Sequence, residues 1–96
     1  MKIDFIKNAE NLEVKLEGRL DTTTAPEFDS FLNENLCGVS ALTIDCKDLT
    51  YVSSAGLRVL LAAHKQLKGA MTLKNVCEIV MEVFEMTGFV EVLEIE

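Results

Sequence analysis

Residues 41–58, ALTIDCKDLTYVSSAGLR, decide the fold of this chain. The run at 41–46 is short, apolar and rich in residues that favour β-structure, which predicts a strand. Residues 47–52 are expected to connect this strand to a helix, because Ser53 and Ser54 are of the type that caps helix starts. Leucines then recur at helical spacing up to Gly69. A strand that leads directly into a helix is typical of α/β proteins.

Upstream of this stretch, the apolar pattern predicts a hairpin and one helix. Residues 2–6 and 12–16 alternate apolar and polar side chains on either side of a polar segment, which is typical of two half-buried strands. Asp21 and the threonines that follow it are possible helix caps, and Pro26 suits a first helical turn. A first helix is therefore expected to run up to Gly38.

Downstream, a further strand, a third helix and a last strand are expected. Residues 71–73 are apolar enough for a strand, residues from about 76 to Gly88 have amphipathic helical spacing, and residues 90–95 alternate again. The order β-β-α-β-α-β-α-β predicts an α/β fold: a mixed sheet of four or five strands with about three main helices packed on one face.

Composition indicates a single domain over residues 1–96 and limits its partners. Hydrophobic residues make up 49% of the chain and there is one proline, so an ordered globule is expected. The net charge of −7 would repel nucleic acid and anionic lipid surfaces, so neither is an expected partner. The N-terminus has no apolar leader and no run is long enough to span a bilayer, which predicts a cytoplasmic protein.

The residues for catalysis or metal binding are missing. Cys37, Cys46 and Cys77 are widely spaced with no C-x-x-C, so reduced, mostly buried thiols are expected, with no metal site. His64, the single histidine, lies ten residues after Ser54 on the same predicted helix, about 15 Å along its axis. A hydrolase that used Ser54 would lack its base. With no phosphate-binding or nucleophile motif either, the chain is expected not to be an enzyme and to need no cofactor.

Two adjacent serines at a predicted helix start admit two interpretations. One hydroxyl can cap the helix by accepting a backbone N–H hydrogen bond, which accounts for one serine and not for both. The other can be a phosphorylation switch, because free N–H groups and the positive end of the helix dipole tolerate a phosphate.

Three motifs, in order, resemble the STAS domains of bacterial anti-sigma factor antagonists over nearly the whole chain. Residues 16–21 (LEGRLD) resemble the family's L-x-G-x-[LI]-D strand end, with residues 22–25 opening its first helix and residues 42–45 similar to its central strand. Residues 48–57 resemble the signature D-L-x-x-[IVM]-[DS]-[ST]-[SA]-G-L, and residues 86–89 (MTGF) resemble M-[ST]-G-[LF]. Ser53 stands where many members have Asp, and many members have a further helix after the last strand, whereas Glu96 is the last residue here.

The resemblance implies regulation by partner switching. Ser54 falls on the family's phosphoacceptor serine. The unphosphorylated protein would bind an anti-sigma factor that is also a serine kinase, phosphorylation would release it, and a PP2C-type phosphatase would reverse the modification. The partner-binding residues implied by the family, together with those expected around the helix start, are Asp21, Thr22, Thr23, Ser53, Ser54, Ala55, Gly56, Leu57 and Arg58.

Several of these assignments have alternatives. Asp21 can equally be a helix cap, Ser53 a cap or a second acceptor, and Arg58 a solvated side chain, while Gly56 is expected to let a partner backbone approach closely. The same domain type also acts as a non-phosphorylated interaction or scaffold module in transporter, lipid-trafficking and stress-signalling complexes. That is the alternative function.

Overall fold

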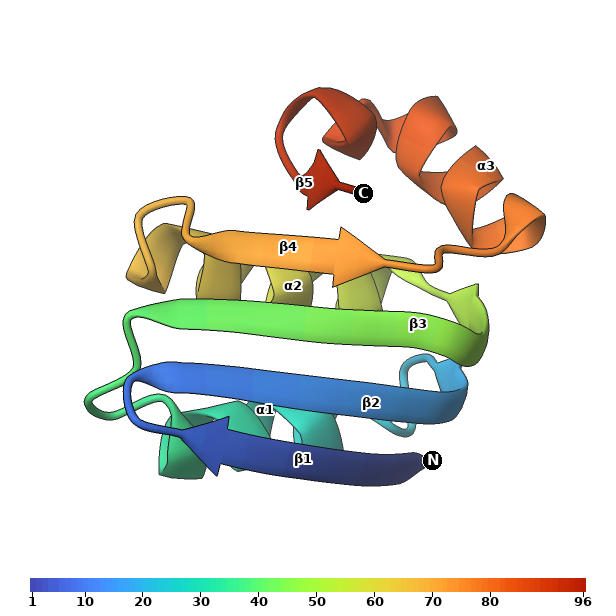
Figure 1. Ribbon diagram of the computed structural model, residues 1–96. Coiled ribbons are helices and arrows are strands. Elements are labelled where there is room, and N and C mark those ends of the chain that lie inside the picture. Colours follow the sequence, from blue (N-terminus) through green and yellow to red (C-terminus); the bar gives the residue numbers. More distant parts are fainter.

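A five-stranded mixed sheet forms one layer of the molecule, with the strand order β1-β2-β3-β4-β5 (Figure 1). The computed structural model describes residues 1–96. Strands β1 and β2 are antiparallel and all other neighbours are parallel. The elements are β1 (Lys2–Asn8), β2 (Asn11–Leu20), α1 (Ala25–Asn35), β3 (Ala41–Val52), α2 (Ser54–Gln66), β4 (Met71–Lys74), α3 (Glu78–Thr87), the 3-10 turn η1 (Phe89–Glu91) and β5 (Glu94–Ile95).

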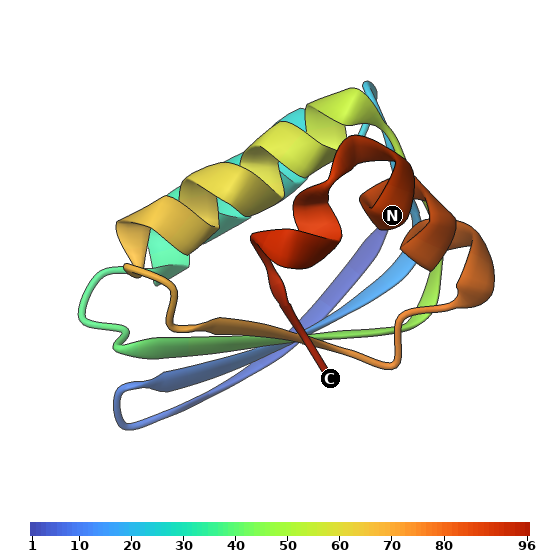
Figure 2. The same ribbon diagram turned by 90° about the horizontal axis from the view of Figure 1, so that it is seen from above.

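The three helices cover one face of this sheet (Figure 2), which confirms the predicted fold class. Buried and exposed side chains alternate along β2, which explains why the helices lie on one face. Leu12, Val14 and Leu16 are buried, whereas Glu13 and Lys15 between them are exposed. The strand therefore presents one apolar face, which the helices bury. The core consists of 22 buried hydrophobic residues and contains no buried polar side chain.

Strand β3 is twice as long as its apolar run predicts. Residues 47–52 are part of the strand and not a connection, so the prediction was wrong there. They pair with β2 from Glu17↔Asp48 to Leu20↔Val52, across register shifts on either side of Gly18. These irregularities break the alternation of buried side chains, which explains why the period of two is absent from this part of the sequence.

The C-terminal segment is less regular than predicted. Residues 90–95 alternate in sequence, yet only Glu94–Ile95 forms a strand, after the turn η1. Leu93 is buried against the core while Val90 and Val92 are exposed, so the alternation in sequence does not correspond to a buried strand face. Helix α3 stops at Gly88, whose φ of 77° is left-handed, as the glycine predicts.

The thiols are less buried than predicted. All three cysteines are free, but only Cys46 is buried, whereas Cys77 is half-buried and Cys37 is exposed. Burial raises the pKa of the Cys46 thiol to about 12. No helix in the structure has the length and apolar character needed to cross a membrane.

Candidate functional site

The candidate site lies where two parallel strands end side by side. The last pairs of β2 and β3 are Arg19↔Tyr51 and Leu20↔Val52. The carboxyl ends of parallel strands meet at one edge of a sheet, so Asp21 and Ser53, the next residue of each strand, lie on the same rim. Parallel pairing thus brings together two motifs that are about thirty residues apart in sequence.

Ser53 is the cap of helix α2. Its backbone is extended, with φ −92° and ψ 175°, and its Oγ accepts a hydrogen bond from the Gly56 N–H at 3.4 Å. Its own N–H donates to the Leu20 carbonyl oxygen at 2.9 Å, which attaches the helix start to the end of β2. The capping function that one serine was expected to supply therefore belongs to Ser53.

Ser54 is the first residue of α2 and is exposed. Its hydroxyl makes no hydrogen bond within the chain, since the cap is supplied by the preceding serine. The position is at the positive end of the helix dipole, where a negatively charged group is stabilised. Arg58 is one helical turn further on the same side and is also exposed.

Asp21 organises the turn before helix α1. Its Oδ1 accepts hydrogen bonds from the N–H groups of Thr23 at 3.0 Å and Thr24 at 3.2 Å. These bonds to the charged form, that of Thr24 above all, lower the pKa of the Asp21 carboxyl below its ordinary value of 3.8. Arg19 Nε lies 3.5 Å from Asp21 Oδ2, and the Arg19 guanidinium stacks on the Tyr51 ring at 4.4 Å. The aspartate thus has a structural role, whatever it contributes to binding.

An open groove of about 320 Å³ separates the starts of α1 and α2. It brings together three of the predicted partner-binding residues, Thr22, Ala55 and Arg58. Sequence reasoning missed the rest of the lining, Ala25, Pro26, Asp29 and Val59. Ala25 and Pro26 were expected only as part of the first helix start, and no motif marks Asp29 or Val59. The packing of α1 beside α2 places all four at the groove.

Two of the predicted partner-binding residues, Gly56 and Leu57, are buried. Leu57 is 4% exposed and belongs to the core. Gly56 is buried, and a Cβ on it would lie 2.7 Å from Leu20 Cγ and 2.8 Å from the Leu20 carbonyl oxygen. The close backbone approach that was expected from a partner at Gly56 is made by Leu20 of this chain.

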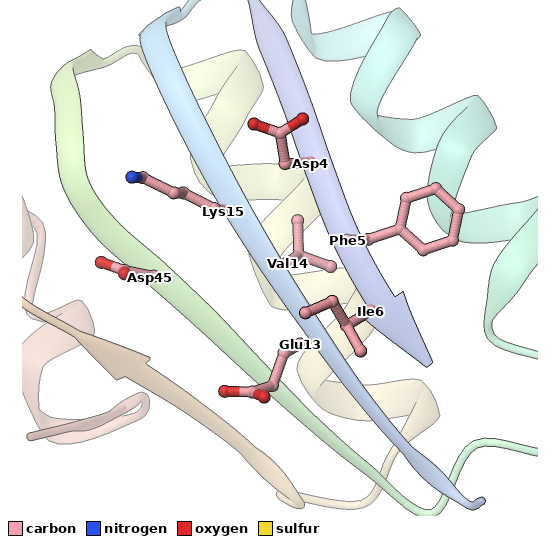
Figure 3. Close-up of a pocket in the computed structure, with 7 residues that line it drawn as sticks. All are labelled: Asp4, Phe5, Ile6, Glu13, Val14, Lys15 and Asp45. Atoms are coloured by element: carbon pink, nitrogen blue, oxygen red, sulfur yellow. The ribbon is translucent and has the colours of Figure 1, made fainter. Parts of the chain in front are cut away.

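A second hollow lies over β1, β2 and β3 on the sheet face opposite the helices (Figure 3). Two of its charged groups already have partners: Lys15 Nζ lies 3.2 Å from an oxygen of Asp48, and Asp45 accepts a hydrogen bond from the Asn75 amide at 3.0 Å. Ile6 and Glu13 lie on the same side in Figure 3, and the lining contains no serine, threonine, cysteine or histidine. This hollow offers no catalytic constellation.

The fold is that of a small α/β domain with an exposed serine where a strand leads into a helix. The sequence profile of the STAS domain matches residues 2–96, so the chain belongs to the STAS domain family.

Several similar proteins are named anti-sigma factor antagonists. The chain is 28% identical over 102 residues to the anti-sigma-B factor antagonist of Bacillus subtilis, covering 99% of this chain and 90% of that protein. Its fold resembles the crystal structure of an anti-sigma factor antagonist from Mycobacterium paratuberculosis, with a TM-score of 0.86 and 18% identity over 98% of this chain and 83% of that one. It also resembles the phosphorylated form of the Bacillus cell fate determinant SpoIIAA, with a TM-score of 0.74 and 16% identity over 99% and 91% of the two chains. Homologues of this kind are regulatory proteins and not enzymes in general.

Proposed function

We propose that this protein is an anti-sigma factor antagonist whose unphosphorylated form binds an anti-sigma factor with serine kinase activity. Phosphorylation of Ser54 releases it, and a PP2C-type phosphatase restores it, all in the cytoplasm. One observation carries the proposal: Ser53 takes the capping role, so Ser54 is left exposed with a hydroxyl that the fold does not use. The protein itself has no catalytic role in the cycle.

The groove beside Ser54 is the part of the surface on which a partner would dock. Thr22, Ala55 and Arg58 lie in it, with Asp21, Thr23 and Ser53 on the adjoining rim. A phosphate on Ser54 adds close to two negative charges at this rim, on a chain whose net charge is already −7. Repulsion and the cost of desolvating the phosphate then oppose docking, while the helix start still accommodates it.

The reaction moves one phosphoryl group. The kinase transfers the γ-phosphoryl group of ATP to the Ser54 oxygen, the hydroxyl proton is lost to the kinase's base, and ADP leaves. Water attacks the phosphoserine in the phosphatase and regenerates the hydroxyl.

The test uses the full chain with anti-sigma kinases encoded in its source genome and ATP. Mass spectrometry should find one added phosphate, and peptide mapping should place it on Ser54. The variant S54A should accept none, whereas the matched neighbour S53A should still be phosphorylated. Binding of the unphosphorylated form's partner should weaken in S54D, because a carboxylate brings part of the phosphate's charge.

Two results would contradict the proposal in different ways. Phosphate found only on Ser53 or on a threonine would mean that the wrong residue was assigned. No phosphate with any kinase, together with tight binding to a transporter or scaffold subunit, would favour the non-phosphorylated interaction module.

A further inference from the structure

The charge of this protein is concentrated at its C-terminal end. Residues 75–96 contain six glutamates and neither lysine nor arginine. The 74 residues before them contain ten acidic and nine basic residues, so that part is nearly neutral. Almost the whole net charge of −7 therefore belongs to α3 and the segment that follows it.

The same segment exposes unusually large apolar side chains. Ile79 is 60% exposed and Met86 is 88% exposed, and both lie on α3. Val90 and Val92, in and after η1, are 40% and 47% exposed. Four of the six large exposed hydrophobic residues of the protein thus fall within fourteen residues of the sequence. Single exposed apolar residues are common on protein surfaces, whereas a cluster of them indicates an interaction surface.

The residues of α3 form three parallel rows around the helix. Val80 and Phe84 are fully buried and pack the helix on the core. At about 100° per residue, Ile79, half-buried Val83 and Met86 lie within a narrow sector next to this row. We call these three residues the α3 stripe.

A row of acids borders the stripe on its solvent side. Glu78, Glu82 and Glu85 are spaced by four and three residues, so they form a line along the helix. All three are exposed, and none is in an ion pair within the chain. The surface of α3 therefore presents an apolar strip with a parallel line of unpaired carboxylates.

We propose that the α3 stripe is a docking surface for a basic amphipathic helix of a second protein. The apolar side of that helix would cover Ile79, Val83 and Met86, and its lysines or arginines would face the glutamate row. This surface is separate from the groove at Ser54, because none of its residues lines that groove. If phosphorylation of Ser54 releases the partner at the groove, as proposed above, the protein would still stay bound to a second protein through the α3 stripe.

Charge decides between the possible occupants. A second copy would place two glutamate rows and two acidic segments against each other, which is unfavourable. Anionic lipid is repelled in the same way. Of these three occupants, a basic amphipathic helix is the one that matches both the apolar strip and the carboxylates.

The test uses a synthetic helical peptide with two heptads of Leu-Lys-Lys-Leu-Leu-Lys-Leu as the probe. The control peptide has Glu at each Lys position. Titration into the isotope-labelled full chain should shift the backbone amide resonances of residues 78–87, and the affinity should fall as salt is raised. The control peptide should not bind.

Matched variants locate the binding. Met86→Gln and Ile79→Gln should each weaken the peptide affinity about tenfold, since apolar anchors carry most of the energy of such contacts. Ile6→Gln removes a comparably exposed isoleucine on β1 and should leave it unchanged. Glu82→Gln should weaken binding more than Glu13→Gln, whose carboxylate lies on the open sheet face (Figure 3). S54D should bind the peptide as the unmodified chain does.

Three outcomes would overturn the proposal. The first is peptide binding that Met86→Gln leaves intact, or that shifts only resonances of β1 and β2. The second is a dimer in sedimentation experiments that Met86→Gln dissociates, which would assign the stripe to a second copy. The third is binding of the unmodified chain to anionic vesicles that Met86→Gln abolishes, which would assign it to a membrane.

Discussion

Leu20 and Gly56 are in direct contact, and this contact fixes the start of α2 against the end of β2. The space where a Cβ of residue 56 would lie is occupied by the side chain and the carbonyl oxygen of Leu20. That oxygen also accepts the hydrogen bond from the Ser53 N–H. The position of Ser54 relative to the rim around Asp21 therefore depends on a glycine two residues away.

The first prediction is that Gly56→Ala destabilises the protein. In a helix, alanine is favoured over glycine by about 1 kcal/mol. Here a methyl group would lie 2.8 Å from a backbone oxygen, which cannot move without shifting β2, and overpacking of this kind costs about 1–3 kcal/mol. We expect urea unfolding to show a net loss of stability. A gain equal to the helix propensity would show that Leu20 yields easily, and Ala62→Gly, at an exposed position of the same helix, calibrates that propensity.

The second prediction separates the two serines by stability. Ser53→Ala removes the cap and should cost about 0.5–1 kcal/mol, at the low end for caps because the hydrogen bond is 3.4 Å long. Ser54→Ala should change the free energy of unfolding by less than about 0.5 kcal/mol, as is usual for exposed sites. Equal losses in urea unfolding would mean that the serines share the cap.

The third prediction concerns acid stability. Hydrogen bonds from Thr24 and Thr23 lower the pKa of Asp21 in the folded protein. A carboxyl whose folded pKa is depressed stabilises the fold above its unfolded pKa, and this contribution is lost as pH falls through the folded pKa. The stability difference between the unmodified chain and Asp21→Asn should therefore shrink below about pH 4. Urea unfolding at a series of pH values, with Asp29→Asn as an exposed control, measures it. A difference that is constant with pH would contradict the pKa shift.

Much of the fold could be predicted because burial follows regular periods in most elements. The alternation at residues 12–16, the helical spacing of α1 and the stop of α3 at Gly88 are local signals, and the structure has each of them. The second half of β3 could not be predicted, because the register shifts next to Gly18 interrupt its alternation. The length of the last strand was overestimated. Leu93 is buried, but it lies in an irregular segment before β5, where alternation of apolar and polar residues carries no information on strand pairing.

The candidate site could be predicted only in part. The Ser53 and Ser54 pair and the Asp21 turn have local signatures, and parallel pairing places them on one rim. Part of the groove lining is contributed by Asp29 and Val59, which come from different helices and carry no motif. Gly56 is buried because it packs against Leu20, thirty-six positions earlier, and no local pattern encodes such a contact.

The last prediction is that phosphorylation of Ser54 leaves the fold as stable as before. The phosphate would lie at the first position of α2, where the helix dipole stabilises negative charge by about 0.3–1 kcal/mol, and the exposed Arg58 is one turn away. The extra repulsion from a chain of net charge −7 acts in the other direction, but most of that charge lies in residues 75–96 and is screened by salt. The free energies of unfolding of the phosphorylated and unphosphorylated forms, measured by thermal unfolding at physiological salt, should therefore agree to within about 1 kcal/mol. Circular dichroism should show that helix α2 is retained. A larger loss would show that the modification releases a partner by melting the helix start, and the charge-repulsion mechanism would then be wrong even if Ser54 is the acceptor.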